Sequence, residues 1–250
     1  MRKELIATLS ILGSLAASGA AAAQTCATPP SCETLGFTKS ETDCDGLEAL
    51  KCPFDQSKLY CPQGGGNMSA AAPGAILYSD GTISDSVIAS KTPVGIVAYV
   101  NGSTGFAVAL TESNQTWGGY GYNVSCLGDM DSGAASADMN GRVNTQCLVS
   151  DSQTHPAANY CNTFSAVSSG KGSSGWYLPA AGELKAMSYS YGAINLGLQK
   201  LSKTQISSSY YWSSSENFSG YAWYVRPSDG SMGYNSTKIS SKPVRCVLAL

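Results

Sequence analysis

The residues in this sequence most clearly able to do chemistry are its nine cysteines. They stand at positions 26, 32, 44, 52, 61, 126, 147, 161 and 246. None of them forms a C-x-x-C pair, and no histidine accompanies the first five, so disulfide bonds are favoured over a zinc site. Because nine is odd, one thiol stays free or pairs with another chain.

Catalytic candidates are few. His155 is the only histidine, and at the start of a predicted helix we expect it to be a surface or capping residue, since a general base needs an oriented partner. Glu183 and Glu216 could form a carboxylate pair for glycoside hydrolysis. Glu183 is better explained as a first-turn helix residue that the helix dipole favours. The sequence therefore predicts no enzyme, and a secreted hydrolase is the least favoured alternative.

Oxygen-bearing side chains gather in one segment rich in glycine, alanine and serine. They are Asp129, Asp131, Asp138 and Asn140. Such oxygen ligands at alternate positions suit calcium, but Asp and Asn also form turns without any metal. The turn interpretation is favoured, so the sequence predicts neither a metal nor a cofactor.

The N-terminal segment, residues 1–23, has the pattern of a cleavable secretory signal peptide. Arg2 and Lys3 precede a short apolar stretch and a run of small residues that ends at Ala23. The apolar stretch is shorter than the roughly 20 residues that span a bilayer, so an uncut membrane anchor is the weaker alternative. We expect a protein that is secreted, periplasmic or displayed at the cell surface, where disulfides persist.

Charge and composition limit the classes of partner. The formal net charge of −2 becomes −3 when Arg2, Lys3 and Glu4 are removed. A mildly acidic chain without a basic run is not typical of nucleic-acid binding or of attachment to anionic lipid. Low charge with abundant Gly, Ser, Tyr and Asn is typical of turn-rich β proteins, either with a tyrosine-based binding surface or simply with exposed loops.

Composition divides the chain after the signal peptide into three parts. A cysteine-rich head at 24–63 is too small for a core of its own and would need covalent staples. Cys32–Cys44 and Cys52–Cys61 are plausible pairs there, although sequence does not determine connectivity. A Gly/Ala linker follows at 64–73, and residues 74–250 form the main domain.

The pattern of residues 74–250 predicts an α+β domain with antiparallel strands at both ends and two to three helices between them. Strands are expected at 75–78, 94–100, 106–110, 210–212, 221–226 and 242–250. The second and third of these are apolar enough to be a buried hairpin. Helices are expected from Pro156, capped by Thr154 or Asp151, and after Pro179, with a shorter piece through Ile194. Residues 120–150 are expected to be loop.

Six motifs follow one another in the C-terminal half. They are Asn140–Thr145, Tyr160-Cys161, Gly175–Pro179 leading to Glu183-Leu184, Tyr211–Glu216, Ala222–Val225 and Val244–Val247. In this order and spacing they closely resemble the family named for the C-terminal domain of the Legionella collagen-like adhesin, over residues 74–250. The resemblance implies a C-type-lectin-like fold in a bacterial surface or secreted protein associated with adhesion, including binding to sulfated polysaccharides.

The resemblance also implies how the domain's cysteines pair. The family pattern has one cysteine on the helix and one in the last strand, and Cys161 and Cys246 match those positions. Cys126–Cys147 is then the remaining pair. The odd thiol must therefore lie in the head, and Cys26 is the first candidate for a covalent or docking partner.

Similar domains serve as diversified binding proteins whose variable surface begins at the Trp-Ser-Ser motif. The corresponding segment supplies the predicted ligand-binding residues Asn217, Phe218, Tyr221, Tyr224, Arg226, Tyr234 and Asn235. Strand alternation places Trp223 inward and Tyr224 and Arg226 outward, while Trp176 and Trp212 are expected in the core.

Together these observations predict a non-enzymatic exported binding or adhesion module. Its ligand is expected to be a glycan or a protein, held by the C-terminal strands and loops. The alternative is a structural or assembly component, such as a minor subunit of a surface appendage, in which the head docks to partners.

Overall fold

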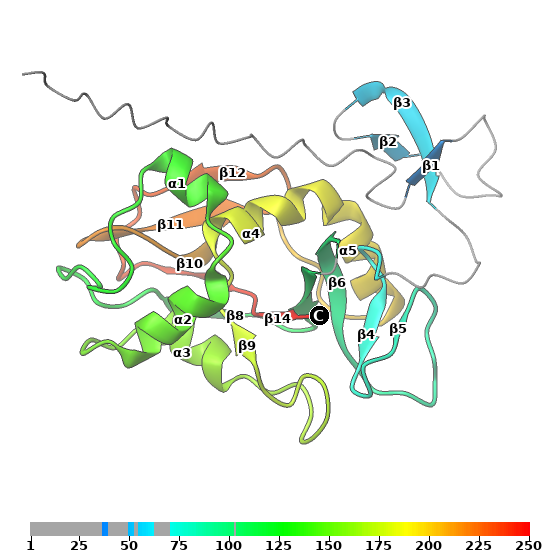
Figure 1. The fold of residues 1–250 in the computed structure, drawn as a ribbon, viewed down its shortest axis with the longest axis horizontal. Coiled ribbons are helices and arrows are strands. Elements are labelled where there is room, and N and C mark those ends of the chain that lie inside the picture. The colour runs from blue at the N-terminus through cyan, green and yellow to red at the C-terminus, as the bar shows by residue number, and fades with distance from the viewer. Residues whose placement is uncertain (1–36, 40–49, 53–54, 63–70, 103) are drawn as a thin grey trace, which may run out of the picture.

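The computed structural model describes residues 37–39, 50–52, 55–62, 71–102 and 104–250 (Figure 1). Its first strands are β1 (Phe37–Lys39), β2 (Leu50–Cys52) and β3 (Asp55–Pro62), which pair antiparallel in the order β1-β3-β2. The predicted signal peptide and the predicted Cys26 and Cys32–Cys44 assignments lie outside the described residues. So do the side chains of Cys52 and Cys61.

The main domain has strands at both ends and helices between them, with the short strand β9 among the helices. Its strands are β4 (Ile76–Tyr78), β5 (Ile83–Ser84), β6 (Pro93–Asn101), β7 (Thr104–Ala109), β8 (Ser113–Thr116), β9 (Trp176–Tyr177), β10 (Tyr211–Phe218), β11 (Tyr221–Arg226), β12 (Ser231–Gly233), β13 (Ser241–Val244) and β14 (Val247–Ala249). Its helices are α1 (Ser132–Ala137), α2 (Gly141–Ser150), α3 (Pro156–Thr163), α4 (Ala181–Ala186), the 3-10 helix η1 (Met187–Ser190) and α5 (Tyr191–Lys200). The predicted α+β class with antiparallel strands is confirmed.

Among the described strands, six form one antiparallel sheet in the order β5-β4-β6-β7-β14-β9. Its two faces belong to different apolar clusters, because Phe106 and Val108 of β7 enter one and Ala107 and Ala109 enter the other. A sheet buried on both faces needs strands that are apolar at every position. The predicted buried hairpin at 94–100 and 106–110 is confirmed for this reason.

Different helices cover the two faces of this sheet. Leu184 of α4 and Ile194 of α5 pack into the first cluster, and Leu148 of α2 and Cys161 of α3 pack into the second. Figure 1 shows α2 and α3 beside each other, away from α5. None of the helices in the described part of the chain is long and apolar enough to cross a membrane.

The prediction that residues 120–150 form a loop is wrong, because this segment contains α1 and α2. Asp131 caps α1 by accepting a hydrogen bond from the Ala134 N–H at 2.8 Å. Helix α2 buries the polar residues Asn144 and Thr145. The buried positions of these two helices are mostly small or polar, so they do not form the apolar stripe that marks a core-facing helix.

Two element boundaries also differ from the prediction. The expected last strand at 242–250 is two strands, since β13 pairs with β8 whereas β14 pairs with β7 and β9. Helix α3 begins at Pro156 as predicted, but its N-cap is His155 rather than Thr154 or Asp151.

Two disulfides join helices α3 and α2 to other parts of the domain, as the family resemblance implied. Cys161–Cys246 ties α3 to the junction of β13 and β14, with Cα atoms 5.2 Å apart. Cys126–Cys147 ties the loop before α1 to α2, with Cα atoms 6.0 Å apart. Both separations lie in the usual range for a bridged pair.

Removing the two bridges separately tests how each stabilises the domain. Replacing Cys161 and Cys246 by alanine should lower the free energy of unfolding by about 4–5 kcal/mol, because the cysteines are 85 residues apart. Replacing Cys126 and Cys147, which are 21 residues apart, should cost about 3 kcal/mol. Urea unfolding of the chain without residues 1–23 measures both losses, and a reversed order would contradict the expectation.

Candidate ligand-binding site

The Trp-Ser-Ser-Ser-Glu motif of β10 is buried along its length. The Ser213 hydroxyl donates to the Trp223 carbonyl at 2.7 Å, which ties β10 to β11. The Ser215 hydroxyl donates to a carboxylate oxygen of Asp138 at 2.6 Å, and the Ser214 hydroxyl accepts from Asn144 at 3.3 Å. Buried hydroxyls with partners of this kind specify packing. The motif therefore joins β10 to its neighbours and presents no reactive group to solvent.

Glu216, the last residue of that motif, forms a fully buried ion pair with Lys238 at 2.5 Å. Glu216 also accepts the Val124 N–H at 2.9 Å, and the Lys238 ammonium donates to the Tyr122 carbonyl at 2.8 Å. The same ammonium lies 4.6 Å from the centre of the Trp117 ring. Burial lowers the pKa of Lys238, and the Glu216 carboxylate opposes that shift. The pair clamps the segment that follows β8 onto the β10–β11 hairpin.

Glu183 occupies the first turn of α4, as predicted. Its carboxylate accepts the Ala180 N–H at 2.8 Å and the Tyr177 hydroxyl at 3.0 Å. Burial raises the pKa of Glu183 to about 7, against the opposing effect of these hydrogen bonds. Glu183 and Glu216 thus each have partners of their own and are both buried.

His155 is the N-cap residue of α3, which fits the capping role of the prediction, but it is buried, so the surface role is wrong. Its Nε2 lies 2.9 Å from Asp151, and its ring packs edge-on against Trp117 with centres 5.0 Å apart. The chain covers the imidazole closely because Gly119 adopts a positive φ of 62° and has no Cβ to meet the ring. It makes no side-chain capping hydrogen bond to α3.

The acidic segment serves local structure. Asp131 caps α1, and Asp138 accepts hydrogen bonds from the Asn140 N–H at 2.9 Å and from Ser215. Asp129 is exposed. Within the described ranges, no group of three or more His, Cys, Asp or Glu side chains is placed to hold a metal ion.

Tyr224 is buried, which corrects the prediction that it faces outward. Its ring lies 5.0 Å from the Tyr210 ring and 5.9 Å from the Trp212 ring, and the Lys242 ammonium lies 4.3 Å from its centre. Both faces of β11 are covered, so strand alternation here separates two buried faces. Arg226, at the end of the strand, keeps 34% of its side chain exposed.

Three other predicted residues hold loops in place. The Asn217 amide donates to the Met130 carbonyl at 3.0 Å, and Asn235 accepts from the Tyr224 hydroxyl. Tyr234 packs against Trp223 with ring centres 5.1 Å apart and stays 48% exposed. The predicted binding residues therefore do not form one surface.

Three exposed aromatic residues and one half-buried tyrosine lie at or beside the turn between β10 and β11. Phe218 is 41% exposed and contacts Tyr221 with ring centres 4.8 Å apart. Tyr120 and Tyr122 are 52% and 58% exposed, and their segment lies against this turn because the Gly121 N–H donates to the Ser219 carbonyl at 2.8 Å. We call Tyr120, Tyr122, Phe218 and Tyr221 the hairpin-tip patch.

Sequence reasoning found half of this patch. The sequence predicts Phe218 and Tyr221 as ligand-binding residues, whereas Tyr120 and Tyr122 fall in the segment that it predicts to be loop. Glycine and aromatic residues are interspersed in Trp117–Tyr122, and this pattern could have indicated exposed aromatic side chains in the loop. Its position against a turn about a hundred residues later follows only from the fold.

The chain is similar to known proteins in two comparisons. A family model described as the Lcl C-terminal domain matches residues 122–248, slightly more than half of the chain. A fimbrial protein from Bacteroides ovatus shares the fold with a TM-score of 0.59 and 19% identity, over 70% of this chain and 48% of that one. The chain thus spans about half the length of that protein. Comparison with the curated proteins finds no match.

The buried ion pair can be tested by removing its cation. Lys238→Met should lower the free energy of unfolding by about 3–5 kcal/mol, because Glu216 is left buried without its counter-charge. Lys91→Met, which breaks the exposed pair with Asp80, should leave the free energy of unfolding nearly unchanged, because solvent screens an exposed pair. Urea denaturation measures both, and similar small losses in the two variants would contradict the role of the buried pair.

The raised pKa of Glu183 predicts a pH dependence of stability. Because folding raises this pKa from 4.5 to about 7, its contribution to stability is complete below pH 4.5 and is lost as the pH rises through 7. The loss is on the order of 3 kcal/mol. In the Glu183→Gln variant this decline should be absent when the free energy of unfolding is measured between pH 4.5 and 7.

The exposed-acid variant Asp85→Asn is the control for that experiment. It should keep the parent's decline in stability between pH 4.5 and 7. An identical decline in the parent and in Glu183→Gln would show that another group titrates.

Proposed function

The chain belongs to the family of the Lcl C-terminal domain, and on that premise we propose that it is an exported, non-catalytic binding or adhesion module. Its ligand is a glycan or a protein outside the cytoplasm. The ligand is held at the hairpin-tip patch. Export is supported by the signal-peptide pattern at 1–23 and by the two disulfides of the domain.

The hairpin-tip patch is the observation that carries this proposal. Exposed aromatic side chains gathered in one place are typical of interaction sites. Tyrosine adds contact area and a hydroxyl at a low cost in side-chain entropy. The patch also has a rigid base, since Lys238 holds the Tyr122 carbonyl and Ser219 holds Gly121. A preorganised surface loses less entropy when it binds.

The absence of catalysis is part of the proposal, and it is supported by the burial and the hydrogen bonds of the candidate catalytic side chains. His155, Glu183 and Glu216 are all buried. Glu183 and Glu216 accept hydrogen bonds from main-chain N–H groups, and His155 pairs with Asp151. General acid–base chemistry requires a group within reach of the substrate. The burial and the partners of these three residues therefore favour a role in packing over a role in proton transfer.

The relationship to C-type-lectin-like domains, which the resemblance implies, also belongs to the proposal. Calcium-dependent sugar binding does not. Asp131 and Asp138 accept hydrogen bonds from Ala134, Asn140 and Ser215, so these carboxylates already have protein partners.

A structural role in a surface appendage is the second candidate function. The fold likeness to a fimbrial protein from Bacteroides ovatus favours it. In that role the exposed aromatic rings would contact another subunit, and the purified chain would assemble without a separate ligand.

Truncating the patch tests the first candidate function. The double variant Tyr120→Ala/Phe218→Ala should weaken binding to any glycan or protein captured on arrays by at least about tenfold, because buried aromatic anchors dominate interface energies. Leu196→Ala/Val143→Ala removes two equally exposed apolar side chains elsewhere and should leave affinity unchanged.

Two results would contradict the proposed site. Equal binding by the two double variants would place the ligand elsewhere on the chain. Arrays without any ligand, together with patch-dependent self-assembly in sedimentation, would favour the appendage component.

A further inference from the structure

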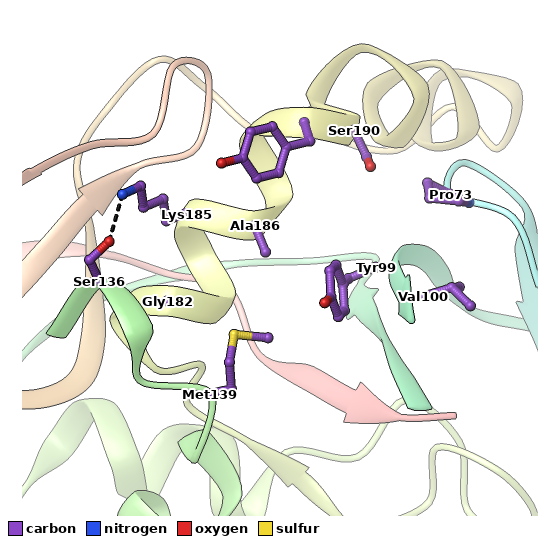
Figure 2. Close-up of a pocket in the computed structure, with 10 residues that line it drawn as sticks. Pro73, Tyr99, Val100, Ser136, Met139, Gly182, Lys185, Ala186 and Ser190 are labelled. Atoms are coloured by element: carbon purple, nitrogen blue, oxygen red, sulfur yellow. Dashed lines mark hydrogen bonds between the residues drawn. The ribbon is translucent and has the colours of Figure 1, made fainter. Parts of the chain in front are cut away.

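A cavity of about 390 Å³ opens between the end of β6, helix α1 and the segment from α4 to η1 (Figure 2). These elements are separate from those that form the hairpin-tip patch. The volume lies within the range of pockets that hold small molecules. Its walls come from three distant parts of the sequence, with Tyr99 on β6, Ser136 on α1 and Ala186 on α4.

One end of the cavity carries a positive charge. The Lys185 ammonium donates to the Ser136 hydroxyl at 2.6 Å, and Figure 2 shows this pair at one end of the site. An ammonium has three donors, and this bond uses one of them. None of the ion pairs formed among the described residues includes Lys185. No Asp or Glu lines the cavity in the part of the chain that the structure describes.

The rest of the cavity is mainly apolar. Figure 2 shows Tyr99, Met139 and Ala186 next along the site from Lys185, with Pro73 at the opposite end. Stacking on Phe106 with ring centres 5.5 Å apart fixes the Tyr99 ring. Met139 is 41% exposed and unbranched, and such a side chain adapts to ligands of different shape.

We propose that this cavity binds a small organic anion with a single carboxylate and a short aromatic or aliphatic body. The carboxylate contacts the Lys185 ammonium and the Ser136 hydroxyl. The body lies against Tyr99 and Met139. A charge-assisted hydrogen bond in a partly apolar site is stronger than a neutral one, so the anion is preferred over its neutral isostere. The proposal is independent of the hairpin-tip patch.

Calorimetric titration of the mature chain tests the preference with a matched pair of probes. 4-Phenylbutyrate should bind at least about tenfold more tightly than the neutral 4-phenyl-1-butanol. Lys185→Met should remove this difference. The control Lys203→Met, an exposed lysine that does not line the cavity, should retain it.

A second variant separates the site from a purely structural role of Lys185. Met139→Trp adds bulk at an exposed position on the cavity wall and should abolish binding of both probes while the thermal unfolding midpoint is retained. The proposal is overturned if the acid does not bind at millimolar concentration. It is also overturned if Lys185→Met and Lys203→Met keep the same preference for the acid.

Discussion

The buried ion pair between Glu216 and Lys238 is the interaction on which the rest of the candidate site depends. Moving two charges out of water is costly, and the cost is offset only when geometry is good and the remaining polar atoms are paired. Here the Val124 N–H and the Tyr122 carbonyl supply those additional partners. Three segments that are distant in sequence therefore meet at one point, and the aromatic loop can occupy only one position on the hairpin.

Burial divides the recognisable motifs from the candidate contact residues. The serines of β10 and Glu183 hold strands and helices together from inside the domain. The rings of Tyr120 and Phe218, in contrast, are 52% and 41% exposed. Substitution of these exposed rings would therefore leave the hydrogen bonds of the buried polar residues in place.

Sequence patterns predicted the elements whose burial is apolar. The β6–β7 hairpin, helix α3 and the α+β class all follow from periodicity, and the pairing of Cys161 with Cys246 was implied by family resemblance. Helix α2 was missed because it buries Asn144 and Thr145, whose polarity conceals the inner face. Tyr224 was placed outward because alternation indicates two faces of a strand but does not show that a second layer covers both.

In the proposed function, the ligand contacts the exposed rings while the buried polar residues keep their positions. Fluorine NMR of the chain without residues 1–23, labelled with 3-fluorotyrosine and titrated with a ligand identified on the arrays, tests it most directly. We predict that the resonances of Tyr120 and Tyr122 shift on binding, while those of the buried Tyr177 and Tyr224 do not. Shifts confined to Tyr177 and Tyr224, with Tyr120 and Tyr122 unchanged, would contradict the claim.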